Sequence, residues 1–410
     1  MQNINAGDTA FVLVSAGLVM LMTPGLALFY GGMVRAKNVL GTIMHSFFIL
    51  GLISVLWVLV GYSLAFGPDV KHFIGGLQWI GLNGVNGVPN KDYAATIPHL
   101  AFMIFQGMFA VITPALITGA FAERMKFRGF VAFTVLWALL VYSPVCHWVW
   151  GVGGWIRNLG VMDFAGGTVV HINSGIAALA AALVLGRRKD YGNGSLVPHN
   201  LPLTVLGAAL LWFGWFGFNA GSALAANGLA ANAFVVTNTA AAMAALSWCA
   251  AEALHRGKPT TLGAVSGCVA GLVAITPASG FVGPLPSVVI GLVAGVACYA
   301  GVLLKSRLGY DDALDVVGIH GVGGTTGALL TGVFASKAIN PGGSNGLLHG
   351  GSASVLGIQA VAVIATIVYS FTVSFILLKL VDAATGLRVS EEEEETGLDL
   401  SQHSEVGYAF

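Results

Sequence analysis

The stretch Asp163-Phe-Ala-Gly-Gly-Thr-Val-Val-His-Ile-Asn-Ser-Gly175 opens an apolar run that continues to Leu185 and stops before the basic triplet Arg187-Arg188-Lys189. A carboxylate stands at its mouth, and a histidine, His171, lies inside it. An ionisable side chain within a lipid-spanning helix is energetically expensive and points to a functional site. The stretch therefore predicts a membrane span that carries a buried functional group.

A second, looser copy lies far downstream, at Asp315-Val-Val-Gly-Ile-His320-Gly-Val-Gly-Gly324. Each copy places a histidine a few residues after an aspartate, in an apolar run. We therefore align Asp315 with Asp163 and His320 with His171. The two stretches indicate an internal duplication.

The overall composition is that of a membrane protein. Hydrophobic residues make up 56% of the chain and charged residues 9%, and the mean hydropathy is +0.83. Soluble domains carry about 25% charged residues, so this chain lacks the polar surface of a soluble fold. The net charge is zero, and no basic block is long enough for a nucleic-acid footprint. The 57 glycines predict closely packed transmembrane helices.

Eleven apolar runs reach roughly 20 residues, the length at which a helix spans a bilayer. The expected fold is therefore an all-α integral membrane protein with eleven transmembrane helices. The runs cover residues 9–33, 39–66, 97–122, 129–150, 164–186, 200–224, 233–254, 260–279, 285–305, 312–335 and 353–380.

Lysine and arginine residues predict the orientation, because they concentrate in cytoplasmic connections. With the N-terminus outside, 14 of the 18 basic residues lie on the cytoplasmic side. This bias predicts an outside N-terminus and an inside C-terminus, and an odd number of crossings agrees with it. We expect a multi-pass protein of the inner (plasma) membrane. Met1 to Asp8 lacks a positive segment, so no signal peptide is expected.

The two copies fall in the fifth and tenth runs, which implies five crossings per repeat. Because five is odd, the second unit enters the membrane from the opposite side, and such inverted repeats place their site near mid-bilayer. We expect repeat one at 9–186, repeat two at 200–335 and an extra helix at 353–380. Together they form a transmembrane domain, 1–385, followed by a cytoplasmic tail, 386–410.

The inverted repeat brings the two histidines toward each other. At a rise of 1.5 Å per residue, His171 lies about 12 Å beyond Asp163 and His320 about 8 Å beyond Asp315. Both imidazoles then approach mid-membrane from opposite faces, where one shared hydrogen bond leaves a donor and an acceptor toward a lumen. A satisfied core histidine is the alternative for each. A metal site is less favoured, because no carboxylate or thiolate spacing completes a ligand set.

The remaining buried polar residues are interpreted as structural. The four cysteines lie in or at the ends of apolar runs without a CxxC spacing, so we expect free thiols. His45 and His147 are taken as core histidines. Asp163 precedes Phe-Ala-Gly-Gly, and its carboxylate is expected to cap the helix by accepting backbone N–H groups. A buried cap of this kind also projects negative potential into the outer mouth.

Aromatic residues cluster at the outer ends of several runs. The clusters are Phe105-Gln-Gly-Met-Phe109, Tyr142 to Gly154, and Trp212-Phe-Gly-Trp-Phe-Gly-Phe-Asn-Ala-Gly-Ser222. An interfacial belt explains Trp79, Trp148 and Trp155. For the other set we predict a cage, because ring faces attract a cation and a hydroxyl accepts its N–H bonds. That set is Trp150, Phe109, Phe218 and Ser222.

The tail from Arg388 to Phe410 is polar and contains the run Glu391 to Glu395. Such a run is usually a solvated segment. The tail also carries Tyr408 and Phe410, which favour docking on the cytoplasmic loops.

Four segments together resemble the ammonium transporter, methylammonium permease and Rhesus family, on its bacterial ammonium-channel branch. They are Asp163 to Asn173, Gly214 to Ser222, Ile275-Thr-Pro-Ala278 and Asp315 to Gly321. The likeness covers nearly the whole chain. It implies a homotrimer in which each protomer has its own pore.

The resemblance also implies roles for individual residues. Trp150, Phe109 and Ser222 would bind ammonium at the outer mouth, with Asp163 in support, and Phe109 and Phe218 would form a stacked gate. The expected pore residues are His171, His320, Phe105, Trp215 and Thr276. The tail segments Gly386-Leu-Arg-Val and Gly397-Leu-Asp resemble the family's cytoplasmic tail and imply regulation by a nitrogen-signalling PII protein. The glutamate run is unusually acidic for that tail.

The expected mechanism splits ammonium into ammonia and a proton. Moving a bare cation through hydrocarbon costs between about 3 and 17 kcal/mol, whereas deprotonating an ammonium group of pKa about 10 at pH 7 costs ~4 kcal/mol. Ammonium is therefore expected to lose its proton near the gate, and ammonia to cross past the histidines. The family resemblance favours a separate path for the proton. Potassium has no proton to lose and should be rejected.

Two other functions compete with transport. One is an ammonium sensor that signals through its tail, and the other is a Rhesus-type channel for a neutral gas. The cage argues against the second, since a neutral gas needs no cation trap. An enzyme is least favoured, because no nucleophile–base pair or metal motif stands outside the pore. No cofactor is expected.

Overall fold

The computed structural model describes residues 4–192 and 196–409, and these are overwhelmingly helical. A two-stranded hairpin, β1 (Asp69–Val70) with β2 (Ile74–Gly75), is the sheet among them. The first-half helices are α1 (Ala6–Met33), α2 (Val39–Leu56), η2 (Trp57–Gly61), α3 (Tyr62–Phe66), α4 (His99–Ile117), α5 (Phe127–Trp137), η5 (Ala138–Tyr142), α6 (Ser143–Trp150), α7 (Trp155–Leu159), η6 (Gly167–Ile172) and α8 (Asn173–Leu185). The second half and tail contain α9 (Leu201–Gly221), α10 (Gly228–Arg256), α11 (Thr261–Ile275), α12 (Pro284–Leu308), η7 (Val317–Gly321), α13 (Val322–Phe334), α14 (Ala353–Thr385), α15 (Glu391–Thr396) and α16 (Leu398–His403). Four short 3-10 turns complete the set: η1 (Ala36–Asn38), η3 (Ile80–Leu82), η4 (Thr118–Ala120) and η8 (Leu347–His349).

Ten helical segments in the described chain are long and apolar enough to cross a membrane. Each falls on one of the predicted runs. The eighth run, 260–279, is different, because α11 has 15 residues and ends at Ile275, before the turn that contains Pro277. This chain is therefore a multi-pass membrane protein, in which α11 is a shorter apolar helix.

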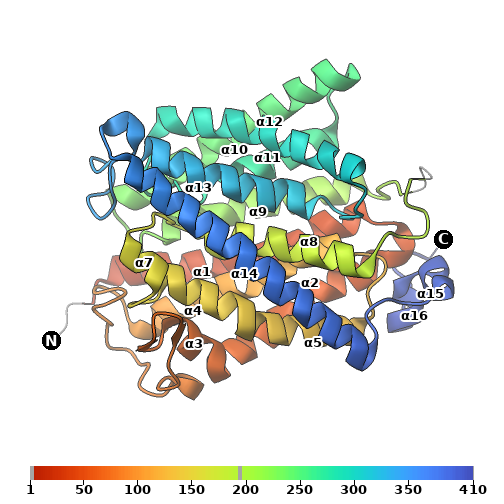
Figure 1. The fold of residues 1–410 in the computed structure, drawn as a ribbon, viewed down its shortest axis with the longest axis horizontal. Coiled ribbons are helices and arrows are strands. Elements are labelled where there is room, and N and C mark those ends of the chain that lie inside the picture. The colour runs from red at the N-terminus through yellow and green to blue at the C-terminus, as the bar shows by residue number, and fades with distance from the viewer. Residues whose placement is uncertain (1–3, 193–195, 410) are drawn as a thin grey trace.

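The helices form one bundle along the long axis of the molecule, and α14 runs obliquely across it (Figure 1). The start of α1 lies beside the loop that precedes α4, since the Asn5 backbone N–H donates to the Thr96 carbonyl at 2.8 Å. The tail helices α15 and α16 lie at the opposite end (Figure 1).

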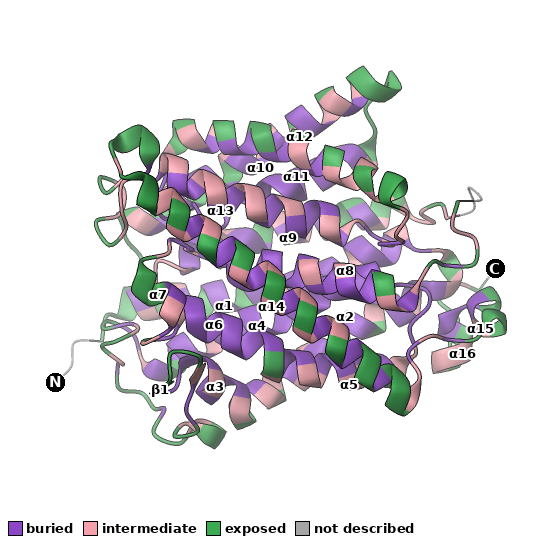
Figure 2. Ribbon diagram, viewed as in Figure 1, coloured by how far each residue is buried: buried purple, intermediate pink, exposed green. Residues whose placement is uncertain are grey.

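Glycine allows α1 and α9 to pack backbone against backbone. A Cβ atom on Gly207 would stand 2.2 Å from the backbone nitrogen of Phe29, so only glycine fits there. The outward faces of α10, α12 and α14 instead carry exposed large hydrophobic side chains, among them Leu246 and Ile364 (Figure 2). A surface of this kind suits lipid rather than water.

Most structural assignments of buried polar residues agree with the coordinates. Cys146, Cys249, Cys268 and Cys298 are all free thiols. His45 packs on the ring of Phe130, with 4.3 Å between centroids. His147 is fully buried, and its Nε2 and Nδ1 atoms lie 2.9 Å from Asp69 Oδ1 and the Ala65 carbonyl.

The interfacial-belt prediction is wrong for Trp148. Its side chain is buried rather than facing lipid, and its indole N–H donates to the Phe73 carbonyl at 2.8 Å. The ring also packs on Tyr369 of α14, with 4.6 Å between centroids. Trp148 therefore anchors the β1–β2 hairpin loop against the bundle.

The tail docks on the loops at its end of the bundle, as predicted. Asp399 accepts the backbone N–H groups of Leu40 and Gly41 at 3.0 and 2.8 Å, and so caps the start of α2. The Lys126 and Val389 backbone N–H groups donate to the carbonyls of Leu387 and Arg124, at 2.7 and 3.0 Å.

The glutamate run is more than a solvated segment. Ser390 and Glu393 form a capping box that starts α15. Glu394 is buried and accepts from Arg388 Nη2 at 2.9 Å, while Lys189 pairs with Glu395. Three consecutive glutamates, Glu393 to Glu395, thus find hydrogen-bond or ion-pair partners, which explains why the acidic sequence does not keep the tail in solvent.

A buried ionic network joins the two halves beneath the tail. Arg188 donates to both carboxylate oxygens of Asp311 at 2.9 Å and to Glu123 at 2.9 Å, and Glu123 also pairs with Arg35 at 3.1 Å. Burial raises the pKa of Glu123, but the charges of Arg188 and Arg35 outweigh it and hold that pKa below its usual value. The carboxylates and guanidinium groups of this network are therefore charged, and each buried charge depends on its partners for stabilisation.

Replacing Arg188 with methionine should destabilise the protein strongly, by about 3–5 kcal/mol, because two buried carboxylates lose their partner. Thermal unfolding in detergent measures the loss. Lys189→Met is the matched control, since that side chain is 40% exposed and its solvent-screened ion pairs should contribute little to stability. Equal losses in both variants would contradict the assigned role of the network.

Candidate functional site

The two histidines meet inside the bundle, as their sequence positions predict. His171 lies in η6 and His320 in η7, and both segments are single π-helical turns. The two Nδ1 atoms are 3.2 Å apart, and the ring planes are inclined by 21°. One imidazole donates to the other, so the two rings share a single hydrogen bond. Isolated π turns of this kind occur frequently at functional sites.

Glycine allows the two halves to approach here. A Cβ atom on Gly175 would stand 2.3 Å from the backbone nitrogen of Gly321, directly after His320. The backbones of α8 and η7 therefore touch beside the histidine pair. The predicted helix starts were too early, since helical structure begins at Gly167 and Val317 rather than at 164 and 312.

An apolar lumen surrounds the histidine pair. Its cavity volume is about 10 Å³, close to the lower limit for one water molecule. Trp215 stacks on His171 with 5.4 Å between centroids, and its indole N–H donates to the Thr276 hydroxyl at 2.9 Å. The His171 Nε2 atom has no hydrogen-bond partner among the described residues. The other lining residues are Met22, Leu26, Phe29, Ile112, Leu116, Val170, Leu211, Phe218, Val269 and His320.

Two phenylalanine rings lie between the lumen and the Trp150 ring, since Phe218 lines the lumen and Phe109 contacts both Phe218 and Trp150. Phe109 and Phe218 are buried, with 4.3 Å between their centroids and 38° between their planes. Phe105 packs edge-on against Phe109 at 5.0 Å, and Phe218 lies 6.0 Å from His171. This Phe pair therefore separates the histidines from the space beyond it.

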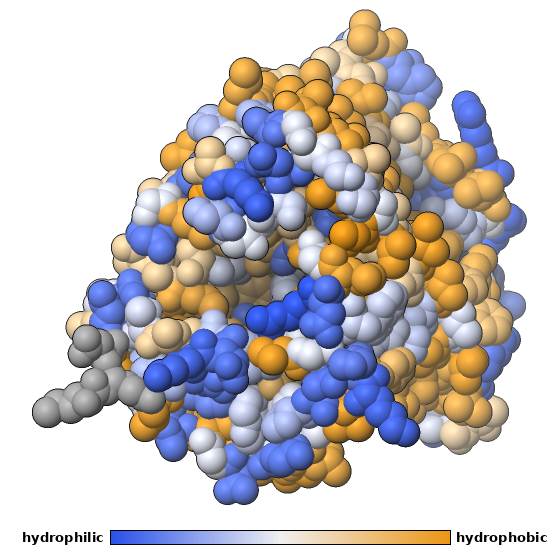
Figure 3. Space-filling view, turned by 60° about the vertical axis from the view of Figure 1, so that its left-hand side comes forward, coloured by the Kyte–Doolittle hydropathy of each residue, from blue (hydrophilic) through white to orange (hydrophobic). Residues whose placement is uncertain are grey.

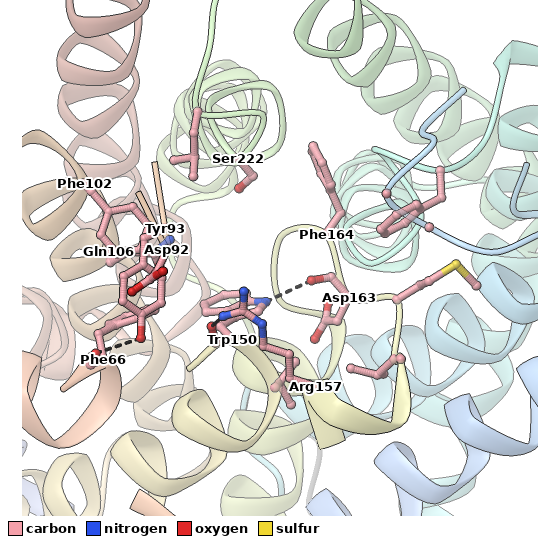
Figure 4. A pocket seen from close by; sticks show the side chains of 18 of the residues that line it. Phe66, Asp92, Tyr93, Phe102, Gln106, Trp150, Arg157, Asp163, Phe164 and Ser222 are labelled. Atoms are coloured by element: carbon pink, nitrogen blue, oxygen red, sulfur yellow. Dashed lines mark hydrogen bonds between the residues drawn. The ribbon is translucent and has the colours of Figure 1, made fainter. Parts of the chain in front are cut away.

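Beyond the Phe pair lies an open vestibule of about 460 Å³. Trp150, Asp163 and Ser222 line it (Figure 4). The Trp150 ring meets Phe109 edge-on at 5.7 Å, and its indole N–H donates to the Asp163 carbonyl at 2.9 Å. The Ser222 hydroxyl donates to the Phe218 carbonyl at 2.8 Å, which leaves its oxygen lone pairs free to accept. In the space-filling view this face is hollowed between hydrophilic residues (Figure 3).

Tyr93, Gln106 and Arg157 also line the vestibule, although the sequence did not single them out. Tyr93 and Arg157 come from loops and a short helix, and no local pattern marks either one. Gln106 also lines the vestibule, and its buried Oε1 atom has no partner among the described residues. Gln106 follows Phe105 inside the aromatic segment, on the same helix as Phe109. That position could have indicated a place in the vestibule.

Asp163 caps the histidine-bearing turn, as predicted. Its carboxylate accepts the backbone N–H groups of Gly166, Gly167, Thr168 and Val169 at 2.9, 2.6, 2.8 and 3.3 Å, and it also contacts the Thr168 hydroxyl. Four donors at a helix N-terminus hold the charge in place. The carboxylate therefore fixes the start of η6 and with it His171.

The turn that bears His320 is capped by a different aspartate from the one we aligned. Asp312 Oδ2 accepts the Val317 backbone N–H at 2.7 Å, at the start of η7. Asp312 precedes His320 by eight residues, the same spacing as Asp163 and His171. The alignment of Asp315 with Asp163 is therefore wrong. Asp315 instead adopts a left-handed backbone (φ 63°) and pairs with Lys305.

Metal binding by the histidine pair gains no support from its surroundings. In residues 4–192 and 196–409, no three histidine, cysteine or carboxylate side chains converge as a ligand set. The pair is instead enclosed by the apolar lumen described above.

A model of the Ammonium Transporter Family matches residues 10–408, almost the whole chain. The chain belongs to the ammonium transporter family. An ammonium transporter of Bacillus subtilis is 57% identical over 403 residues and covers 98% of each chain, and one of Aquifex aeolicus is 54% identical, covering 99% of this chain and 94% of its own.

Solved structures of ammonium transporter relatives share the fold. The crystal structure of Saccharomyces cerevisiae Mep2 has a TM-score of 0.89 and 37% identity, over 95% of this chain and 89% of that one. A structure titled Sensor Amt Protein has a TM-score of 0.88 and 33% identity, over 97% and 98% of the chains. The family likeness thus extends to the whole bundle of this ammonium transporter.

The stability of this protein should depend on the titration of Asp312. Burial raises the pKa of Asp312 to about 6, although the charge of Lys305 opposes that shift. The unfolded side chain has a pKa of about 3.9, so the folded state binds more protons between the two values and stability falls as pH rises through 6. The free energy of unfolding of Asp312→Asn, relative to that of the wild type, should therefore increase as pH rises, by on the order of 2–3 kcal/mol between pH 4 and pH 8.

Thermal unfolding of the wild type and Asp312→Asn across pH 4–8 measures this difference. Asparagine keeps an oxygen that accepts from Val317, so the cap itself is retained. A pH-independent difference between the two proteins would contradict the assignment.

Proposed function

We propose that this transporter binds ammonium in the vestibule, removes a proton at the Phe109–Phe218 pair, and conducts ammonia past His171 and His320. The observation that carries the proposal is the order of the parts. An open vestibule with cation-binding groups ends at a closed aromatic pair, and behind that pair lies a narrow apolar lumen with two hydrogen-bonded imidazoles.

The vestibule groups suit a small cation that carries N–H bonds. The ring face of Trp150 attracts a cation by roughly 0.5–2 kcal/mol. The Ser222 oxygen accepts an N–H bond, and the Asp163 carbonyl and carboxylate add negative potential at the same mouth. Phe109 borders this site through its contact with Trp150.

The lumen suits ammonia better than ammonium. It offers few polar atoms and little room, so a cation loses its hydration there, at a cost between about 3 and 17 kcal/mol. Deprotonation at pH 7 costs ~4 kcal/mol by comparison. The Trp215 ring and the lone His171 Nε2 atom leave one polar contact for a molecule the size of ammonia. Potassium cannot use this route, because it has no proton to lose.

The proton follows separately in our proposal, which makes transport electrogenic. The support is the hydrogen-bonded pair itself, because two imidazoles in contact pass a proton without moving a cation through the lumen. Phe105, Trp215 and Thr276 complete the pore by fixing the gate and the His171 ring.

We infer eleven crossings with the N-terminus outside and the C-terminus inside. The start of α1 and the tail lie at opposite ends of the bundle (Figure 1), which requires an odd number of crossings. Counting α11 with the ten longer spans gives eleven. The positive-inside bias places the tail end in the cytoplasm. Residues 9–186 and 200–335 are then inverted repeats, with α14 as the extra helix of the domain 1–385.

The assembly and regulation are proposed on the same basis. A homotrimer in the inner (plasma) membrane agrees with the apolar faces of α10 and α12. The docked tail, 386–410, would be the regulatory segment, read by a PII protein. Its contacts with Lys37, Lys126 and Lys189 place it over the proposed cytoplasmic loops.

An ammonium sensor is the alternative function, and the relative titled Sensor Amt Protein keeps it open. A neutral-gas channel of Rhesus type is the other. Uptake of ammonium by proteoliposomes separates transport from sensing. A current on solid-supported membranes, evoked by ammonium and methylammonium but not by potassium, separates an ion-driven process from gas conduction.

Replacing both histidines, as His171→Leu with His320→Leu, should reduce the ammonium current by about tenfold or more, since the lumen loses its polar contacts. His45→Leu is the matched control, because His45 packs among phenylalanine rings outside the lumen. Unaltered ammonium current together with unaltered potassium exclusion in the double variant would refute the role of the pair.

Replacing Trp150 with leucine should raise the KM for ammonium roughly three- to thirtyfold, the range expected for losing a cation–ring contact. Trp155→Leu is the control, because Trp155 packs on Trp148 rather than lining the vestibule. The concentration dependence of the transient current gives both KM values. An equal change in the two variants would show that the effect is structural.

A further inference from the structure

The vestibule of this transporter contains a fixed positive charge. Arg157 lies in α7, on the vestibule wall, and its Nη1 atom donates to the Trp150 carbonyl at 2.7 Å (Figure 4). Its guanidinium carbon lies 5.9 Å from the centre of the Tyr93 ring. These two contacts hold the positively charged Arg157 side chain at the entrance to the proposed ammonium site.

No carboxylate neutralises this guanidinium by direct contact. Among the described residues, Arg157 forms no ion pair. Asp92 also lines the vestibule, but its carboxylate does not reach Arg157, and the Asp163 carboxylate is occupied by the N–H groups of η6. The charge of Arg157 therefore acts on whatever enters.

We propose that Arg157 is a specificity-determining residue that selects among entering cations by electrostatic repulsion before they reach Trp150. The inference rests on the proposed function of the vestibule. Repulsion grows in proportion to the charge of the entering ion, so a divalent cation is opposed twice as strongly as ammonium. Ammonium recovers part of the binding free energy lost to this repulsion, because it donates N–H hydrogen bonds at the site and Mg²⁺ cannot.

The position of Arg157 explains why the Trp150 ring alone does not set selectivity. A ring face attracts any cation, and a divalent ion more than a monovalent one. A fixed guanidinium at the rim opposes this preference, because it repels a divalent ion twice as strongly as a monovalent one. The arrangement lowers the affinity for ammonium somewhat and protects the site from occupation by divalent ions.

Removing the charge tests the proposal. Arg157→Gln should lower the KM for ammonium at low ionic strength by roughly two- to sixfold, for a separation on the order of 8 Å and an effective dielectric constant of about 40–80. The difference should vanish when an impermeant organic salt raises the ionic strength from about 0.01 M to about 0.5 M, because the Debye length then falls below that separation. Mg²⁺ should inhibit the variant at lower concentrations than the wild type.

Two further variants separate charge from structure. Arg157→Lys keeps the charge and should retain the wild-type KM and its salt dependence. Lys71→Gln makes the same change of charge at an exposed residue of the same end that does not line the vestibule, and should leave KM unchanged. Proteoliposome currents with ammonium alone and with added Mg²⁺ give all the values.

The outcomes are distinct. A KM for Arg157→Gln that is equal to or higher than that of the wild type at low salt would overturn the proposal, as would the same shift in Lys71→Gln. A change that persists at high salt would assign Arg157 a structural role through the Trp150 carbonyl and overturn it as well. Failure of the proposed function would appear differently, as absence of ammonium current in the wild type.

Discussion

The shared hydrogen bond between His171 and His320 is the contact on which the rest of this architecture depends. The two rings come from turns 149 residues apart in the sequence and meet at 3.2 Å, so their meeting requires both backbones to be placed accurately. Two devices provide that accuracy. Glycines at the crossing let the backbones touch, and an aspartate caps each π turn eight residues before its histidine.

The two caps are equivalent in position but differ in chemistry. Asp163 is bonded by four backbone N–H groups, whereas Asp312 has one oxygen without a hydrogen-bond partner among the described residues and a nearby lysine instead. The turn η6 is therefore held by neutral donors and η7 by a balance of charges. The same eight-residue unit has thus been adapted to two different environments, an aromatic vestibule on one side and an ionic network on the other.

The sequence predicted those features that rest on local patterns. The capping role of Asp163 could be predicted because a short segment with two glycines follows it directly and offers free N–H groups. The two histidines could be singled out because a polar residue is rare in an apolar run. The second cap was misassigned, because the loop before η7 holds three aspartates, and only the fold shows which one reaches the helix start. Trp148 was misplaced for a related reason, since a hairpin distant in sequence covers it. Arg157 and Tyr93 gave no signal, because only the fold brings the short helix α7 and the loop that holds Tyr93 together.

The cap that Asp399 supplies to α2 has a consequence for biosynthesis. The two N–H groups at the start of the second helix find their partner on a residue 358 and 359 positions later. When the first helices leave the ribosome, the start of α2 must therefore stay hydrated until the segment around Asp399 has been translated. A nascent chain that ends before Asp399 would leave these two N–H groups without their acceptor, so the start of α2 matures only after synthesis has reached the tail.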